Sequence, residues 1–459
     1  MQSKTYEMDM SNGPLFRKIL IFAVPLMISG MLQLFFNAAD VAIAGRYAGR
    51  HALAAVGATG SLVNLMTNVF IGFSVGVNVL VAQFYGAGQD ENVNQTVHTA
   101  IALSLICGVV LAGVGILLAE LFLSWMGTPD DVLGHAALYI RIYFAGMPVI
   151  LLYNFGSAVL RSVGDTRRPL YYLMAAGVVN VLLNLYFVIE WEMGVAGVAL
   201  ATVLSQCISA GLVVRCLLKA EGSLRLDLKK LKIHKSKMKR IIRTGLPAGL
   251  QGSIFSLSNV LIQSSVNSFG SVVMAGNTAD SNLEGFAYAG MNAFHHAALC
   301  FTGQNLGAGR QDRVGKVLKN CLILATITGL TLSGLLLLFR EQLLGLYTSD
   351  AEVTRYAVLR LSWFLPLFFT CGWMDTMVGT LRGMGYSIMP MIVSTIGACG
   401  LRILWIFTIF AWNPTLGTLY VSYPITWLIT AVVHMICFYQ VRKPYHTAQR
   451  EKAGKEKGR

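Results

Sequence analysis

The sequence predicts an all-α polytopic membrane protein, and three observations carry this prediction. Of the 459 residues, 55% are hydrophobic and 13% are charged, whereas a soluble domain carries about 25% charged residues. Apolar runs of roughly 20 or more residues recur along the whole chain, each long enough to cross a ~30 Å hydrocarbon core. Two short phrases also occur twice at one fixed distance, which indicates an internal duplication. The ~10-residue alternating segments of a membrane β-barrel are absent.

The duplicated phrases define the repeat. Gln-Phe-Tyr-Gly-Ala-Gly at 83–88 returns as Gln-Asn-Leu-Gly-Ala-Gly at 304–309, and Leu-Arg-x-x-Gly-x-x-x-x-Pro at 160–169 returns at 381–390. Both offsets are 221 residues, while Pro25 and Pro247 lie 222 residues apart, so the register shifts by one residue within each half. Glycines in these phrases permit tight turns at helix ends. Duplicated membrane units are common in secondary transporters.

The apolar runs predict twelve transmembrane helices. We expect them at 16–42, 53–82, 95–118, 136–160, 169–189, 195–218, 243–266, 272–303, 316–339, 356–380, 387–411 and 416–441. They form two six-helix lobes. The expected organisation is an N-terminal segment (1–15), an N-lobe (16–218), a basic inter-lobe loop (219–242), a C-lobe (243–441) and a basic tail (442–459).

The distribution of basic residues predicts the orientation. With both termini in the cytoplasm, the inner side carries 29 of the 36 Lys and Arg residues. The outer side carries six, among them Arg360, and Arg402 alone lies in the middle of a span. Because each half has an even number of helices, the halves should be parallel repeats about an axis along the membrane normal. The net charge of +14 is then explained by the positive-inside rule and predicts no binding to nucleic acid.

The sequence lacks the motifs that mark several kinds of enzymatic and metal-binding site. The eight cysteines lie in or beside apolar runs without a CxxC pair, which predicts neither a disulfide framework nor a zinc site. There is no Walker A sequence, CxxCH, HExxH or glycine-framed serine. We therefore expect no enzymatic activity and no cofactor. An ion gradient is the remaining obvious source of energy for transport.

Polar residues inside the first-half spans predict an ion site, because ionisable groups in a membrane interior mark function by default. Asp40 lies toward the outer end of the first span, Asn180 and Asn184 share one face of the fifth, and Thr202 lies in the sixth. Carboxylate, amide and hydroxyl oxygens suit Na⁺ or a titrating proton. The alternative is that Asp40 lies at the outer interface and is simply hydrated.

The second half carries its own acids. Asp280 and Glu284 are spaced i, i+4 in the eighth span, and Asp375 in the tenth corresponds by the repeat to Asn154. One carboxylate would serve as a counter-ion for the substrate and another as a proton acceptor. The alternative is a helix–helix hydrogen bond. Arg402 should have a carboxylate partner, and pairing with Asp375 would compete with a coupling role.

Substrate contacts are expected from polar, methionine and aromatic side chains. Methionines such as Met291, with Phe36 and other aromatic residues, can line an adaptable cavity, although ordinary packing would give the same pattern. The candidates for substrate contact are Gln33, Phe36, Asn37, Asn154, Asp280, Glu284, Met291 and Asp375.

The chain resembles the MATE (multidrug and toxic compound extrusion) family in its prokaryotic branch. The resemblance covers about residues 15–441. It rests on the six-plus-six layout, on Pro25, Gln33 and Asp40, on the paired Gln-x-x-Gly-Ala-Gly ends and on Leu-Arg-x-x-Gly-Asp-Thr-x-x-Pro. It implies two lobes around a central cavity and antiport of organic cations against H⁺ or Na⁺.

The resemblance also assigns residues. Asp40 matches the N-lobe carboxylate used for cation coupling, and Asn180 and Thr202 match further positions there. Asn184 stands where many relatives carry an aspartate, so this chain lacks one N-lobe acid. Glu284 and Asp375 resemble C-lobe acidic positions, and we expect them to share the coupling.

These observations together predict a monomeric exporter in the bacterial plasma membrane. It would expel small cationic amphipaths in exchange for H⁺ or Na⁺ by rocking of the two lobes. Ion coupling is expected at Asp40, Asn180, Asn184, Thr202, Glu284 and Asp375, with the first four as the possible Na⁺ ligands. The alternative is a flippase for lipid-linked precursors, which would need several basic residues in its cavity, whereas only Arg402 lies in mid-span.

Overall fold

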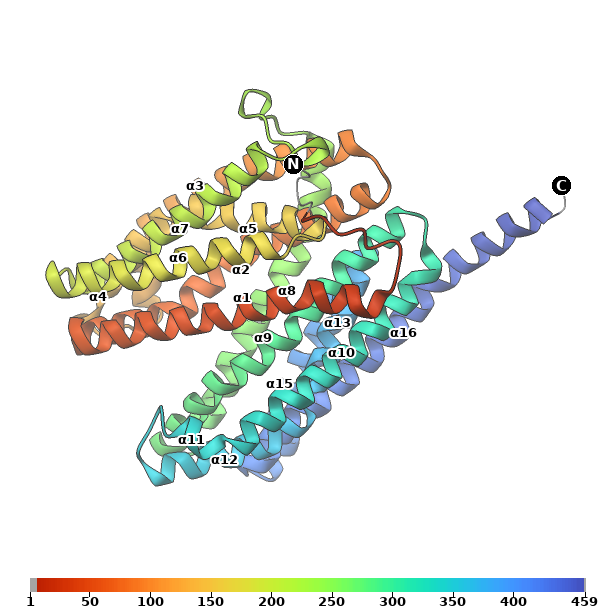
Figure 1. Cartoon of the computed structure of the whole chain (residues 1–459). Coiled ribbons are helices and arrows are strands. Elements are labelled where there is room, and N and C mark those ends of the chain that lie inside the picture. Colours follow the sequence, from red (N-terminus) through yellow and green to blue (C-terminus); the bar gives the residue numbers. More distant parts are fainter. Residues whose placement is uncertain (1–5, 458–459) are drawn as a thin grey trace. The chain divides into compact units, whose positions relative to one another are not determined.

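The computed structural model describes residues 6–457, and every regular element in that range is a helix (Figure 1). The first five residues of the expected N-terminal segment and the last two of the expected tail lie outside the described residues.

The first half of the chain folds into seven α-helices. Their bounds are α1 Leu15–Ile43, α2 Arg50–Gly86, α3 Asp90–Trp125, α4 Asp130–Ala145, α5 Met147–Ser162, α6 Arg167–Leu185 and α7 Gly194–Leu218. Helices α4 and α5 meet at a 48° bend and together occupy the fourth expected span.

The second half repeats this order. Its helices are α8 Lys235–Asn267, α9 Ser271–Gly307, α10 Gln311–Leu338, α11 Arg340–Leu344, α12 Ala351–Phe364, α13 Phe369–Gly383, α14 Ile388–Ser394, α15 Leu401–Trp405 and α16 Leu416–Lys457. A matching 49° bend separates α12 from α13 in the tenth expected span.

Each of the twelve expected spans coincides with a helix or a bent or interrupted pair. By length and composition, eight helices of the described chain can cross a membrane, or ten if each bent pair is one span. The other two, α8 and α9, are 33 and 37 residues long, but many Ser, Asn and Gln residues interrupt their apolar character.

The duplicated phrases form the same turns in both halves. Gly88 and Gly309 have φ of 66° and 70°, and Gly164 and Gly385 both have φ of 95°. These left-handed conformations are accessible to glycine and close the ends of α2, α9, α5 and α13. The prediction of tight glycine turns is confirmed.

Contacts divide the described chain into two units. Unit 1 holds residues 6–9 and Ile28–Ser256, and unit 2 holds Met10–Met27 and the chain from Leu257 onward. The first parts of α1 and α8 therefore belong to the unit opposite to the rest of each helix, whereas the expected lobe limits keep both helices whole.

In unit 1, the first part of α8 lies directly on α2 through small residues. Gly72 and Gly76 of α2 face Gly245 and Gly249 of α8, both pairs spaced G-x-x-x-G. A Cβ atom at Gly245 would lie 2.5 Å from the Phe73 Cα and 2.6 Å from the Gly72 carbonyl oxygen. Such spacing lets two backbones approach closely, which is how helices associate in membranes.

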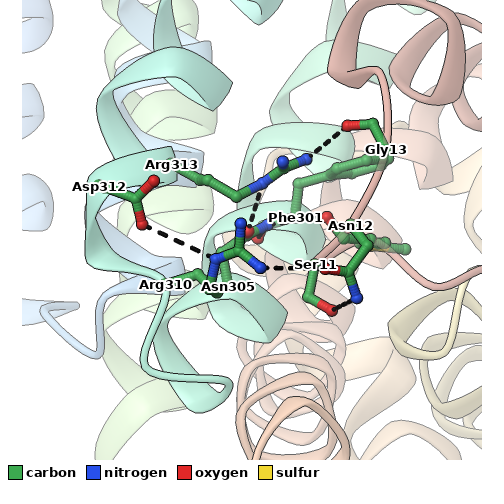
Figure 2. Close-up of polar contacts among 9 residues, drawn as sticks. Ser11, Asn12, Gly13, Phe301, Asn305, Arg310, Asp312 and Arg313 are labelled. Atoms are coloured by element: carbon green, nitrogen blue, oxygen red, sulfur yellow. Dashed lines mark hydrogen bonds and ion pairs between the residues drawn. The ribbon is translucent and has the colours of Figure 1, made fainter.

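In unit 2, the segment before α1 is bound to the turn between α9 and α10 (Figure 2). The Asn305 amide donates to the Met10 carbonyl at 3.0 Å. Arg310 donates to the Asn12 side chain at 3.0 Å, and Arg313 to the Gly13 carbonyl at 2.8 Å. Position 305 is where the second copy of the duplicated phrase has Asn and the first has Phe84, so this difference has a structural role.

The inter-lobe loop is bound to the beginning of α3 in unit 1. Asn94 donates to the Arg225 carbonyl at 2.8 Å, and Thr99 accepts from the His234 N–H at 3.1 Å. His98 Nε2 accepts the Asp227 N–H at 3.1 Å, because a backbone N–H can only donate. The loop is therefore an ordered part of unit 1 and more than a flexible linker.

Candidate functional site

A polar cluster in unit 1 joins three helices that are distant in sequence. Asn184 of α6 donates to Asp40 Oδ1 of α1 at 2.6 Å, and Thr202 of α7 lies 3.5 Å from Asp40 Oδ2. Asn184 also donates to Asn180 Oδ1 at 3.3 Å, and Asn180 to Thr202 at 3.5 Å. The four residues predicted as an ion site therefore lie together.

Local backbone features position this cluster. The α6 helix continues after Leu185 as a π-helical turn, Tyr186–Glu190, and α1 continues as another, Ala44–Ala48. Such wide turns often accompany functional sites in helices. One turn before Asn180, Gly177 leaves space for the Phe36 ring, which lies where a Cβ would be. Phe36 therefore packs α1 against α6.

The cluster brings oxygen atoms of three kinds around one carboxylate that has no basic neighbour in the described part of the chain. None of the ion pairs found among residues 6–457 involves Asp40. Asn184 is fully buried, and within the described chain its Oδ1 has no hydrogen-bond partner. A carboxylate beside a spare amide oxygen and a hydroxyl can accept a proton or offer oxygen ligands to a hard cation.

The remaining unit 1 candidates for substrate contact differ in how far their side chains are exposed to solvent. Gln33 and Asn37 of α1 are exposed. Asn154 of α5 is half-buried, and its amide donates to the Ile150 carbonyl of its own helix at 2.8 Å.

In unit 2, Asp280 and Glu284 of α9 share Arg360 of α12. Arg360 Nη1 bonds to the Asp280 carboxylate, and its Nη2 lies 3.1 Å from Glu284 Oε2. The Arg360 and Asp280 side chains are 4% and 1% exposed, whereas Glu284 is 22% exposed. The i, i+4 acids thus form an ion-pair network with Arg360, and only Glu284 reaches solvent appreciably.

Asp375 lies one helix away, on α13. Its carboxylate lies near the side chains of Tyr288 and Asn292 of α9. Its carbonyl accepts from His295 Nδ1 at 2.7 Å. Met291, a candidate for substrate contact, is 1% exposed and its sulfur packs on Gly329 and Gly372.

Arg402 has aromatic neighbours in place of the carboxylate partner considered above. It donates to Thr426 Oγ1 at 3.2 Å, and its guanidinium lies 4.0 Å from the Tyr423 ring centre and 5.6 Å from that of Trp427. Within 6–457 no ion pair joins Arg402 to Asp375. Asp375 is therefore not committed to that arginine.

A family profile that matches once in each half of the chain identifies the family. The MatE family profile matches the chain twice, at residues 25–186 and again at 247–408. The chain belongs to the MatE family. The two matches begin at Pro25 and Pro247, at the 222-residue offset found between the halves, and the protein is accordingly a multi-pass membrane transporter.

Curated relatives of this MatE protein match over most of their length. It is 29% identical over 400 residues to "Probable multidrug resistance protein YoeA" of Bacillus subtilis (strain 168), covering 86% of each chain. It is 28% identical to "Probable multidrug resistance protein NorM" of Thermotoga maritima, covering 83% of each. It is 25% identical to an "FAD transporter" of Shewanella oneidensis over 75% of this chain and 77% of that one.

Solved structures show the same fold. The chain superposes with a TM-score of 0.90 and 21% identity on the outward-facing conformation of a multidrug resistance MATE family transporter, covering 97% of this chain and 100% of that one. A MATE transporter in the bent conformation gives a TM-score of 0.88 at 20% identity, covering 98% and 99%. The twelve-helix, two-lobe layout is therefore that of the MATE fold.

Sequence reasoning missed three residues of the MatE protein's unit 2 cluster. The basic-residue count places Arg360 at the outer flank of the membrane, yet the residue is buried. Tyr288 and Asn292 were not singled out. A signal was present, because Asp280, Glu284, Tyr288 and Asn292 follow one another at intervals of four and so mark one polar stripe along α9.

Proposed function

We propose that this MatE protein is a secondary antiporter that exports small organic, mostly cationic amphipaths in exchange for H⁺ or Na⁺. The observation that carries the proposal is the unit 1 cluster, in which Asp40 meets two amides and a hydroxyl but no basic partner among residues 6–457. An uncompensated acid in a membrane protein interior is costly unless it exchanges a cation. Binding and release of the coupling ion would take place there.

The substrate side of the proposal rests on unit 2. Glu284 and Asp375 are partly accessible acids on neighbouring helices, and Tyr288 between them is 41% exposed. Carboxylates beside an exposed aromatic ring suit an apolar cation. The names of the relatives from B. subtilis and T. maritima, both probable multidrug resistance proteins, favour varied substrates over one metabolite. In unit 1, the exposed Gln33 and Asn37 are the more available of the expected contacts.

The proposal also covers the membrane in which the protein resides and the orientation of the chain in it. We infer a monomer in the bacterial plasma membrane with both termini in the cytoplasm, since that orientation puts 29 of 36 basic residues on the inner side.

The competing function, a flippase for lipid-linked precursors, has less support. A pyrophosphate headgroup requires accessible basic side chains. Arg360 is neutralised by Asp280, and Arg402 is 2% exposed beneath Tyr423 and Trp427.

The deciding experiment uses the purified protein in liposomes loaded with a fluorescent organic cation. An imposed pH gradient and an imposed Na⁺ gradient are tested separately, so the same assay names the coupling ion. Wild-type protein should drive efflux with one gradient. Coupling free energies between two sites are typically about 1–3 kcal/mol, so in wild-type protein the coupling ion should change the affinity for the organic cation by roughly 5- to 150-fold. Asp40→Asn should abolish this change in affinity together with gradient-driven efflux.

The control is Asp312→Asn, since the Asp312 side chain is 56% exposed at a helix end and only 3.9 Å from Arg310. It should leave efflux unchanged. Gradient-driven efflux by Asp40→Asn at the wild-type rate would refute the coupling role of Asp40. Absence of efflux from wild-type liposomes under both gradients would refute antiport itself.

A further inference from the structure

Arg360, Asp280 and Glu284 form the ion-pair network of unit 2, and the two acids differ in burial and in hydrogen bonding. Asp280 is almost fully buried and accepts a hydrogen bond from Arg360 Nη1. The Glu284 side chain is 22% exposed, although its Oε2, which lies 3.1 Å from Arg360 Nη2, is itself buried and has no aligned hydrogen bond within the described chain. The same guanidinium therefore binds one acid tightly and the other loosely.

Among direct ion pairs, two carboxylates share one guanidinium, so Arg360 alone does not neutralise both acids when they are ionised. Arg402 acts on Glu284 only through space, without an ion pair within the described chain. The loosely held, accessible Glu284 is where an incoming cation can compensate the remaining negative charge. Such a cation must compete with Arg360 Nη2 for the same carboxylate.

We propose that Arg360 is a specificity-determining residue, a tethered cation that competes with cationic substrates for Glu284. The inference rests on the proposed export of organic cations. Arg360 lowers the affinity of Glu284 for a cation and holds the carboxylate in place while no substrate is bound. It thereby favours release of the substrate after each transport cycle.

The surroundings of Arg360 prevent it from following the substrate. Its Nη1 also donates to Ser281 Oγ at 3.0 Å and to the Asn277 carbonyl at 3.3 Å. The guanidinium lies 4.8 Å from the Phe364 ring centre and 5.9 Å from that of Tyr420. These contacts fix the planar fork, so its second nitrogen stays directed at Glu284.

Lysine cannot reproduce the two terminal nitrogens of the Arg360 guanidinium. An ammonium is a compact point charge and can stay with Asp280, Ser281 and the Asn277 carbonyl, but it cannot also present a second nitrogen to Glu284. Arg360→Lys should therefore keep the buried pair and release Glu284. Glu284→Gln removes the charge for which the two cations compete.

The test is a double-mutant cycle on the purified full-length protein in detergent. The probes are N-methylacridinium, a planar cation, and acridine, its neutral analogue at mildly alkaline pH. Arg360→Lys should tighten N-methylacridinium binding by roughly fivefold, the upper range for one partly exposed ion pair. Acridine binding should not change. In the Glu284→Gln background, Arg360→Lys should have no effect on either probe.

A second variant covers the case in which Arg360→Lys does not fold. The double variant Asp280→Asn, Arg360→Gln replaces the buried ion pair with two neutral polar side chains and leaves Glu284 without a competing cation, so it should also tighten cation binding. The inference is overturned if Arg360→Lys changes cation binding equally in the wild-type and Glu284→Gln backgrounds, or if it weakens cation binding. Either result leaves the proposed function untouched. If wild-type protein binds neither probe and exports no cation, the proposed function fails and the inference fails with it.

Discussion

Gly245→Ala tests whether the close contact between α8 and α2 stabilises unit 1. The added Cβ would lie 2.5 Å from the Phe73 Cα and 2.6 Å from the Gly72 carbonyl oxygen. Both neighbours are backbone atoms, so no side chain can rotate away. The two helices must separate.

The separation sets the magnitude. Carbon atoms of this kind do not approach below 3.0 Å and make ordinary contact from 3.4 Å, so α8 must withdraw by about 0.5–0.9 Å. A gap of about 0.5–1 Å forfeits a quarter to a half of each van der Waals contact across the crossing. Overpacking costs about 1–3 kcal/mol, and the helix propensity of Ala returns about 0.5–1 kcal/mol. The difference is a net loss centred on about 1 kcal/mol and no larger than about 2.5 kcal/mol.

The assay is thermal unfolding of the purified protein in detergent. The matched control is Gly211→Ala in α7, where a Cβ meets nothing within 4 Å, so this variant should gain about 0.5–1 kcal/mol. If Gly245→Ala is stabilised like Gly211→Ala, the close crossing does not contribute as argued.

Two further predictions concern the buried pair and the inter-lobe loop. Asp280→Asn should lower the free energy of unfolding by about 3–5 kcal/mol, since it leaves a buried guanidinium short of its main partner. Glu284→Gln should lower it by about 1 kcal/mol or less. Equal losses of stability in thermal unfolding would contradict the division into a tightly and a loosely bound acid. His98→Ala removes the acceptor of the Asp227 N–H, worth about 1 kcal/mol, and should speed tryptic cleavage at Lys229 and neighbouring lysines by roughly fivefold; an unchanged cleavage rate would show that this bond does not hold the loop.

The scaffold was predictable because its signals are local. Apolar runs give helices whose length is set by the bilayer, and the left-handed turns at Gly164 and Gly385 follow from the duplicated phrase itself. The unit 1 cluster was predictable for a similar reason, since Asp40, Asn180 and Asn184 interrupt apolar helices where polar groups are rare. Their pairing could then be inferred from the resemblance to a family.

The unit 2 network was only half predictable. The i, i+4 spacing of Asp280 and Glu284 put both acids on one face of α9. Arg360 is 76 residues further along the chain, near the outer end of an expected span, and there the sequence does not distinguish a headgroup arginine from a buried partner. Likewise, Met291 and Asn154 were expected at a binding surface, yet one packs in the interior and the other bonds to its own helix.

The sequence by itself determined that the protein is a duplicated, all-helical membrane transporter with an acid in its first helix, because hydrophobic length, repeat offset and turn glycines are encoded residue by residue. Only the tertiary structure decided which charges neutralise one another. Arg360 joins Asp280 and Glu284, Arg402 packs on Tyr423 and Trp427, and Asp40 has no basic partner among residues 6–457. The physical reason is that neutralisation depends on distances of a few ångströms between helices, which no spacing along one helix specifies.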